Sequence, residues 1–336
     1  MKNVSVIMPT YNKADYLELT LASFCSQTNS NFEIVVINDG STDESETVAK
    51  RYKNKLNLKY IKINNSGRSI ARNKGIEASE GDVILFNDDD RIVSPSFIEE
   101  HNRSISEGGE KSIVIGWKHT LLTILKKNIS IKQKDLLEII KKNTDIIPKL
   151  YPESPIQLVF PEDLETFDYN KVSRFQMNDG HDNFPDYFRD YGKDLKNFHF
   201  KWLLGTTANM SLNKSFLLET GLFDERFKGW GMEDTELSYR LIDNGGELIF
   251  NPLAVNYHQT HPRGTWNDIV KNLRENTVYF CEKFMRLDTL LFYRWSKQDI
   301  QMKEANMLMD LATGNENVMR ELHFIYSRFF QNNRES

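Results

Sequence analysis

Residues 4–41 read VSVIMPTYNKADYLELTLASFCSQTNSNFEIVVINDGS, and this stretch decides the fold class. The runs at 4–8 and 32–37 are apolar and rich in β-branched side chains, which is typical of buried strands. Between them, residues 14–26 carry apolar side chains at helical spacing. A strand, a helix and a strand joined by short connections predict a right-handed crossover between parallel strands.

The same alternation continues along the chain to residue 90. Apolar runs at 58–63 and 82–86 predict two further strands, and helices are expected at 43–52, with Ser41 or Thr42 as N-cap, and at 69–79. Polar loops follow three of the strands, at 9–12, 38–41 and 87–90. Because ligands bind at the carboxyl ends of parallel strands, we expect these loops to form one site at one rim of the sheet.

The composition excludes several classes of protein. The 336 residues carry a net charge of −5, so the chain as a whole has no nucleic-acid footprint. Two cysteines, Cys25 and Cys281, make neither a disulfide framework nor a zinc cluster, which favours a reducing, intracellular setting. No secretory signal begins the sequence and no window approaches the roughly 20 apolar residues of a membrane span. We therefore expect a soluble cytoplasmic protein.

Two regions depart from the α/β pattern. Residues 118–200 are rich in Lys, Asn and Asp and predict an irregular insertion around the site, either an acceptor-binding element or a covering layer. Residues 265–336 show helical spacing of Leu and aromatic side chains, which indicates a helical extension whose apolar stripe is either core or an oligomer face. We place the domain boundary at 264/265.

The loop Asn87-Asp88-Asp89-Asp90 is the first candidate for chemistry. Three adjacent carboxylates repel one another, and a divalent cation such as Mg²⁺ or Mn²⁺ resolves that repulsion. A solvated acidic turn explains the same pattern.

The second candidate is the segment GWGMED, residues 229–234. Its glycines permit close backbone approach, Trp230 offers a flat apolar face for a sugar ring, and Glu233 and Asp234 stand at a helix start that favours ionised carboxylates. An ionised carboxylate is a plausible general base, although a pair of capping acids gives the same sequence.

Histidines and cations complete the candidates. His258 and His261 follow the acid pair by about 25 residues and fit either a metal site or structural roles. Arg68, Arg72 and Lys74 follow the third strand and either bind phosphates or form a solvated helix face.

Taken together, these motifs resemble glycosyltransferase family 2, inverting enzymes with a GT-A fold that use nucleotide-sugar donors. The match covers residues 3–118 and 203–264, and the second part is similar to the galactosyltransferase and N-acetylgalactosaminyltransferase type of module found in bacterial chondroitin polymerase. The resemblance implies an α/β fold with a Rossmann-like, mainly parallel sheet flanked by helices. It also implies transfer of a hexose or N-acetylhexosamine from a UDP-sugar to an acceptor hydroxyl, in bacterial polysaccharide or glycoconjugate synthesis.

Position by position, the resemblance assigns roles to individual residues. The second aspartate of the family's Asp-x-Asp-Asp pattern ligates the metal, which points to Asp89, and His258 matches the metal histidine better than His261. Asp234 matches the catalytic base, with Glu233 orienting it or binding the acceptor. The implied nucleotide-sugar contacts are Pro9, Tyr11 (stacked on the base), Asp39 (hydrogen-bonded to uracil), Gly67, Arg72, Asp88, Asp89 and Trp230.

One position departs from the family pattern, because Asn87 stands where the first aspartate is expected. If the register is Asp88-Asp89-Asp90 instead, the metal ligand moves to Asp90.

Two other function classes compete with the transferase. A nucleotidyltransferase would carry a Gly-rich, basic loop after the first strand, where this chain has PTYNKADY. A non-catalytic nucleotide- or glycan-binding module of the same fold is disfavoured because both acidic constellations are retained. The sequence leaves open whether the helical extension mediates dimerisation or contact with a membrane surface.

Overall fold

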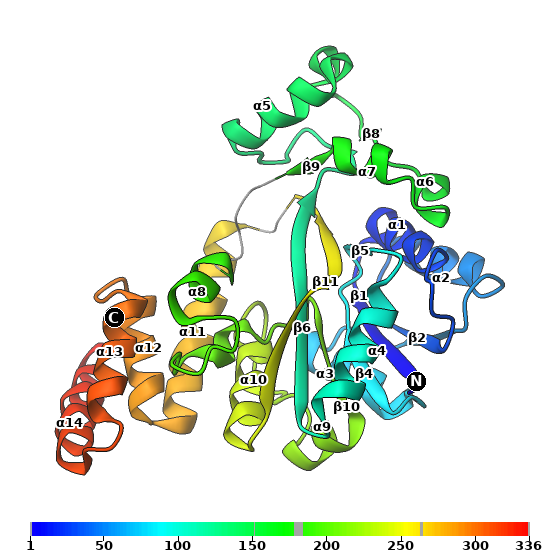
Figure 1. Cartoon of the computed structure of the whole chain (residues 1–336). Helices are drawn as coiled ribbons and strands as arrows, with labels where there is room; N and C mark the ends of the chain where they lie inside the picture. Colours follow the sequence, from blue (N-terminus) through cyan, green and yellow to red (C-terminus); the bar gives the residue numbers. More distant parts are fainter. Residues whose placement is uncertain (1, 151, 178–183, 263–264, 335–336) are drawn as a thin grey trace.

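The computed structural model describes residues 2–150, 152–177, 184–262 and 265–334. A sheet of nine strands forms its centre, in the order β3-β2-β1-β4-β10-β6-β11-β5, with β9 paired to β6 (Figure 1). The strands are β1 Val4–Thr10, β2 Phe32–Asn38, β3 Leu58–Lys62, β4 Val83–Phe86, β5 Arg91–Val93, β6 Ser112–Leu121, β9 Gln176–Met177, β10 Met210–Asn213 and β11 Glu247–Gln259.

The predicted α/β fold is confirmed, and the sheet is mixed. Strands β3, β2, β1 and β4 are parallel, as the alternation of the first 90 residues predicts. The strand β10 then pairs antiparallel with both β4 and β6, so the sheet direction reverses there. Beyond it, the long strand β11 pairs parallel with β6 and antiparallel with β5, which brings its end at His258 opposite Arg91.

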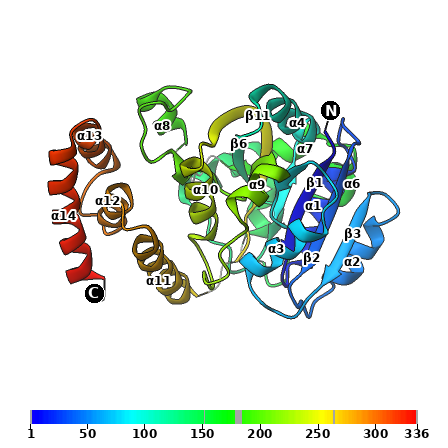
Figure 2. The same cartoon turned by 90° about the horizontal axis from the view of Figure 1, so that it is seen from below.

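Helices cover both faces of the sheet (Figures 1 and 2). On one face, the alternate side chains Val4, Val6 and Met8 of β1 pack in one apolar cluster with α1, α2 and α4. On the other face, Ile7 belongs to a cluster that continues through α3 and α10 into the C-terminal helices as far as Phe330. These helices are α1 Ala14–Phe24, α2 Ser45–Tyr52, α3 Arg68–Ala78, α4 Phe97–Gly108, α9 Lys214–Thr220 and α10 Glu233–Asp243.

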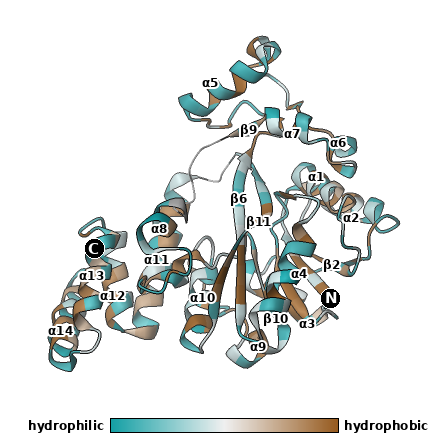
Figure 3. Ribbon diagram, in the orientation of Figure 1, coloured by the Kyte–Doolittle hydropathy of each residue, from teal (hydrophilic) through white to brown (hydrophobic). Residues whose placement is uncertain are grey.

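The C-terminal extension is helical, as predicted, and its apolar stripe is largely core. It comprises α11 Trp266–Phe284, α12 Leu287–Ser296, α13 Met302–Ala312 and α14 Glu316–Asn333. Phe280 and Phe292 pack edge to face and both contact the buried Trp202. Figure 3 shows hydrophobic residues concentrated in the central strands.

The mid-chain segment begins later than the predicted residue 118, because β6 runs on to Leu121. It contains α5 Gln133–Lys142, α6 Pro161–Glu165, α7 Tyr169–Arg174 and α8 Phe184–Tyr191, with a two-stranded sheet of β7 Ile124–Leu125 and β8 Ile156–Gln157. A small apolar cluster around Leu122 and Ile139 holds α5 beyond the end of the sheet (Figure 1). The helix α8 packs elsewhere, with Phe188 stacked on Phe250 of β11 and Tyr187 stacked on Phe198.

One predicted helix start is wrong by a few residues. The helix α2 begins at Ser45, after Glu44, and neither Ser41 nor Thr42 caps it. Asp43 takes the capping role instead, because its carboxylate accepts a hydrogen bond from the Ser45 N–H at 3.1 Å.

Within the described residues, no helix has both the length and the apolar character needed to cross a bilayer.

Candidate active site

The loops that follow the parallel strands meet at one rim of the sheet, as the sequence predicts. A cavity of about 1230 Å³ opens at the carboxyl ends of β1, β2 and β4. Of the candidate cations, Lys74 does not line it, since its side chain is exposed and paired with Glu77. All the residues to which the family resemblance assigns roles do line it. These residues are Pro9, Tyr11, Asp39, Gly67, Arg72, Asp88, Asp89, Trp230, Glu233, Asp234 and His258. The strand-end loops and the GWGMED segment, more than 130 residues apart in sequence, therefore share one site.

The loops on the β2 side are held by the carboxylate of Asp39. Its two oxygens accept hydrogen bonds from the backbone N–H groups of Ser66 at 2.7 Å and Gly67 at 2.9 Å. Gly67 has φ of 95°, a backbone conformation that a side chain disfavours. Each carboxylate oxygen keeps a lone pair for a further donor. Tyr11, on the neighbouring loop, is 49% exposed and free to meet a planar ligand.

The acidic loop after β4 brings Asp88, Asp89 and Asp90 to the wall of the cavity. Asn87 does not line the cavity; it is buried, and its amide donates to the carbonyl oxygens of Asp88 at 3.1 Å and Arg91 at 3.0 Å. Its own side-chain oxygen accepts from the Asn256 amide at 3.0 Å. An ionised aspartate here could not donate those bonds, so the amide of Asn87 stabilises the turn.

A candidate metal centre consists of Asp90, His258 and His261, whose ligand atoms all lie within 4.8 Å of one another. The Asp90 Oδ2 lies 3.0 Å from His261 Nε2 and 3.8 Å from His258 Nε2. Burial lowers the pKa of His258 to about 3, so its ring is neutral, as a metal ligand must be. One carboxylate and two imidazoles suit a transition ion such as Mn²⁺ better than Mg²⁺, which prefers oxygen ligands. The donor set therefore fits the predicted cofactor. Asp89 is not part of this group.

Lys13 is a site residue that the sequence analysis did not single out. Its ammonium bonds the Asp90 carboxylate and lies 3.6 Å from Asp89 Oδ1. Burial would raise the pKa of Asp90, but Lys13 together with the two histidines holds it well below its ordinary value. For Asp89, burial prevails and raises the pKa to about 6. A lysine three residues beyond the end of β1 was the available signal, because that loop and the acidic loop share one rim.

Opposite the metal group, Glu233 and Asp234 begin α10. Arg72 lies between the acids: it bonds Glu233 Oε1 at 3.0 Å and Asp88 Oδ1 at 3.2 Å, and its side chain is only 4% exposed. Burial alone would raise the pKa of Glu233, but the positive charge of Arg72 keeps the pKa of Glu233 below its ordinary value. Burial and the neighbouring Glu233 carboxylate raise the pKa of Asp234 to about 6. The pair therefore combines one firmly ionised carboxylate with one of higher basicity, as acid–base chemistry near neutral pH requires.

The half-parallel sheet with its cavity at the strand ends, lined by a candidate metal group and two buried acids, is the GT-A fold of glycosyltransferases. Residues 5–150 match the family model of glycosyl transferase family 2, and residues 194–262 match that of the N-terminal domain of galactosyltransferase. The predicted resemblance to glycosyltransferase family 2, with a chondroitin-polymerase-like second part, is thereby confirmed.

Individual proteins agree with these models. The chain is 27% identical to the uncharacterized glycosyltransferase YfnE of Bacillus subtilis, over 85% of this chain and 71% of YfnE. It is 26% identical to an Escherichia coli chondroitin synthase over 87% of this chain but only 41% of the synthase, so it spans less than half of that relative. The crystal structure of S. aureus TarS 1–349 in complex with UDP-GlcNAc has the same fold, with a TM-score of 0.59 at 15% identity, over 99% of this chain and 89% of that TarS fragment.

Proposed function

We propose that the protein is an inverting glycosyltransferase that moves a hexose or N-acetylhexosamine from a UDP-sugar to a hydroxyl group of a glycan or other acceptor. The observation that carries this proposal is that Asp234 faces the same cavity as the group of Asp90, His258 and His261. A volume of about 1230 Å³ is ample for a nucleotide-sugar together with part of an acceptor.

The nucleotide is assigned to the β1–β2 side of the cavity. Tyr11 would stack on the uracil ring, Pro9 would line the base pocket, and Asp39 would accept the ring N–H with its remaining lone pair. Gly67 would allow the nucleotide to approach the backbone closely, since a Cβ there would meet nothing within 4 Å in the protein and would point into open space.

The diphosphate is assigned to the metal side. Asp90, His258 and His261 would hold Mn²⁺, with Asp89 beside them, and a bound divalent ion neutralises charge that develops on a departing diphosphate. Lys13 adds a second positive charge at the same place. Arg72 is engaged with Glu233 and Asp88, so we assign to it the orientation of these acids alongside its predicted contact with the donor.

The sugar would lie between these two groups, with Trp230 as an apolar face and Asp88 near its hydroxyls. The acceptor oxygen attacks the anomeric carbon as the bond to the diphosphate breaks, and Asp234 accepts the hydroxyl proton in the same step. Glu233 stays ionised against Arg72 and fixes the start of α10. A single displacement inverts the anomeric configuration.

Two measurements test the proposal. Thermal unfolding should shift upward with uridine diphosphate and Mn²⁺, less with guanosine, cytidine or thymidine diphosphates, and the shift should disappear with EDTA. The protein should also release uridine diphosphate slowly from one of a panel of UDP-sugars when no acceptor is present.

The Asp234→Asn variant separates catalysis from binding. It should keep the thermal shift and lose the release. Absence of a shift with every nucleotide would overturn the assignment and favour the binding-module alternative with a different ligand. A shift without any release, in the wild type and the variant alike, would favour a nucleotide-binding module.

A further inference from the structure

The loop that leads into the catalytic acids has an unusual backbone. Gly229, Gly231 and Met232 have φ of 69°, 96° and 75°, so three of four consecutive residues are left-handed, and one of these carries a side chain. Met232 stands at the N-cap of α10, yet no side-chain hydrogen bond caps the helix there. The conformation of residues 228–232 therefore depends on what packs against it.

Helix α11, the first helix of the C-terminal extension, supplies that packing. The buried side chain of Asn276 donates two hydrogen bonds, to the carbonyl oxygens of Lys228 at 2.9 Å and Gly231 at 2.8 Å. A Cβ at Gly229 would lie 2.4 Å from the side chain of Asn272, one helical turn earlier. One amide thus joins the two ends of the loop.

The helix is itself fixed to α10, which carries the acids. Lys283 Nζ lies 2.7 Å from Oε1 of Glu236, a carboxylate of α10 with no exposed surface. Phe280 packs at right angles on Tyr239 of α10, with ring centroids 5.5 Å apart. Helix α11 therefore contacts both the loop and the helix α10 that follows it. A movement of α11 relative to either of them would break its hydrogen bonds to the loop or its contacts with α10.

We infer that Asn276 is the positioning residue for the catalytic acids: through its two hydrogen bonds, helix α11 sets the path of residues 228–232 and with it the place of Glu233 and Asp234. The C-terminal extension is then a working part of the active site. This inference rests on the proposed function for its catalytic half, whereas its conformational half can be measured without any substrate.

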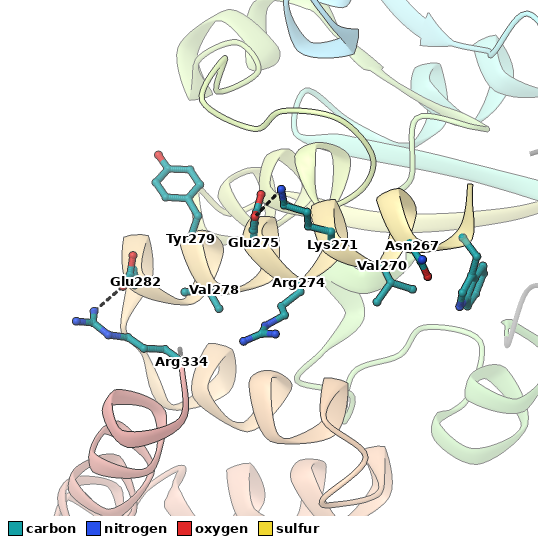
Figure 4. A pocket seen from close by; sticks show the side chains of 10 residues that line it. Asn267, Val270, Lys271, Arg274, Glu275, Val278, Tyr279, Glu282 and Arg334 are labelled. Atoms are coloured by element: carbon teal, nitrogen blue, oxygen red, sulfur yellow. Dashed lines mark hydrogen bonds and ion pairs between the residues drawn. The ribbon is translucent and has the colours of Figure 1, made fainter. Parts of the chain in front are cut away.

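The test compares Asn276→Ala with Asn267→Ala, a matched substitution of an exposed asparagine on the same helix. Asn267 lines a second cavity of about 750 Å³ on the outer side of α11, away from the loop (Figure 4). Hydrogen–deuterium exchange over residues 228–236 reports the loop, binding of uridine diphosphate with Mn²⁺ reports the donor site, and kcat for uridine diphosphate release reports the chemistry.

In Asn276→Ala, exchange over residues 228–236 should accelerate. The value of kcat should fall about 10- to 100-fold, as expected of a displaced catalytic group, while the Kd of uridine diphosphate stays within about twofold. Asn267→Ala should match the wild type in exchange, in the Kd of uridine diphosphate and in kcat.

Unchanged exchange in folded Asn276→Ala overturns the inference. So does a lower melting temperature with unchanged kcat, because a merely structural residue would give that result. If exchange accelerates but even the wild type neither binds nor cleaves a UDP-sugar, the proposed function fails and the loop-positioning role stands.

Discussion

Replacement of Arg72 by methionine should destabilise the protein in a way that depends on pH. Arg72 and Glu233 form a buried ion pair at 3.0 Å, with side chains 4% and 6% exposed. Methionine keeps much of the apolar stem of arginine but removes the charge. Leaving Glu233 charged and unpaired would cost about 3–5 kcal/mol. The alternative is that Glu233 takes up a proton.

The cost of that proton sets the expected magnitude. The ordinary pKa of Glu233 is 4.5, and neutralising a carboxyl group costs about 1.4 kcal/mol per pH unit above its pKa. At pH 7 the cost is about 3 kcal/mol, and at pH 5 it is below about 1 kcal/mol. In the variant the pKa of Glu233 in the folded state is raised above its value in the unfolded chain. The variant should therefore lose stability relative to the wild type as the pH rises from about 4.5 to 7.

Urea unfolding at pH 5 and pH 7 measures this difference. The Arg72→Met, Glu233→Gln double variant should recover most of the loss at pH 7, because the unpaired carboxylate of Glu233 is then absent. Lys74→Met, which removes an exposed ion pair with Glu77 on the same helix, should change the free energy of unfolding by no more than about 0.5 kcal/mol at either pH. A loss for Arg72→Met that is equal at both pH values, or that the double variant does not reduce, would refute the reasoning.

Three further predictions follow from the site and the core. The pKa of Asp234 is raised to about 6, and only its ionised form accepts a proton. The rate of uridine diphosphate release should therefore fall about tenfold per pH unit below pH 6. A rate that stays constant down to pH 5 would contradict the role of Asp234 as base. His261→Ala should weaken Mn²⁺ binding, measured by calorimetry. Loss of a side chain that only hydrogen-bonds a metal ligand lowers metal affinity by roughly 10- to 100-fold, and loss of a ligand itself should lower it by more. An unchanged affinity would remove His261 from the ligand set. Burial lowers the pKa of His101 to about 4 from 6.5, so its native ring stays neutral while the unfolded chain takes up a proton below pH 6.5. Urea unfolding should therefore show a loss of about 2 kcal/mol from pH 7 to pH 5 that is absent in His101→Gln; equal pH dependence in the two proteins would disprove it.

The sequence was most informative where local pattern determines structure. Alternating apolar runs and helical spacing located the parallel half of the sheet, and that topology alone brought Tyr11, Asp39 and the acidic loop to one rim. The start of α10 at Glu233 was predicted as well.

What the sequence did not reveal depends on contacts between distant segments. The antiparallel strand β10, four residues long, is recognisable only by its neighbours β4 and β6. The roles of Asn87 and Asn276 depend on partners 169 and 45–48 residues away. The proposed choice of Asp90 over Asp89 as metal ligand similarly depends on His258 and His261, because the pairing of β11 with β5 brings this part of the chain beside the acidic loop.

The division of the cavity between two stretches of chain has a consequence for how such proteins diversify. The proposed contacts to the uridine come from residues 9–67, whereas the proposed base, the two histidines of the metal group and the wall formed by Ile269 and Leu273 of α11 come from residues 229–273. Under the proposed function, mutations in the later stretch can therefore accumulate and change the acceptor while the earlier stretch continues to bind the same nucleoside. The two stretches meet at Arg72 with Glu233 and at Asp90 with His258 and His261, and recombination between relatives must keep both of these junctions. Under the proposed function, a new linkage specificity can arise by exchange of the second half alone, provided that the new half keeps the two histidines of the metal group.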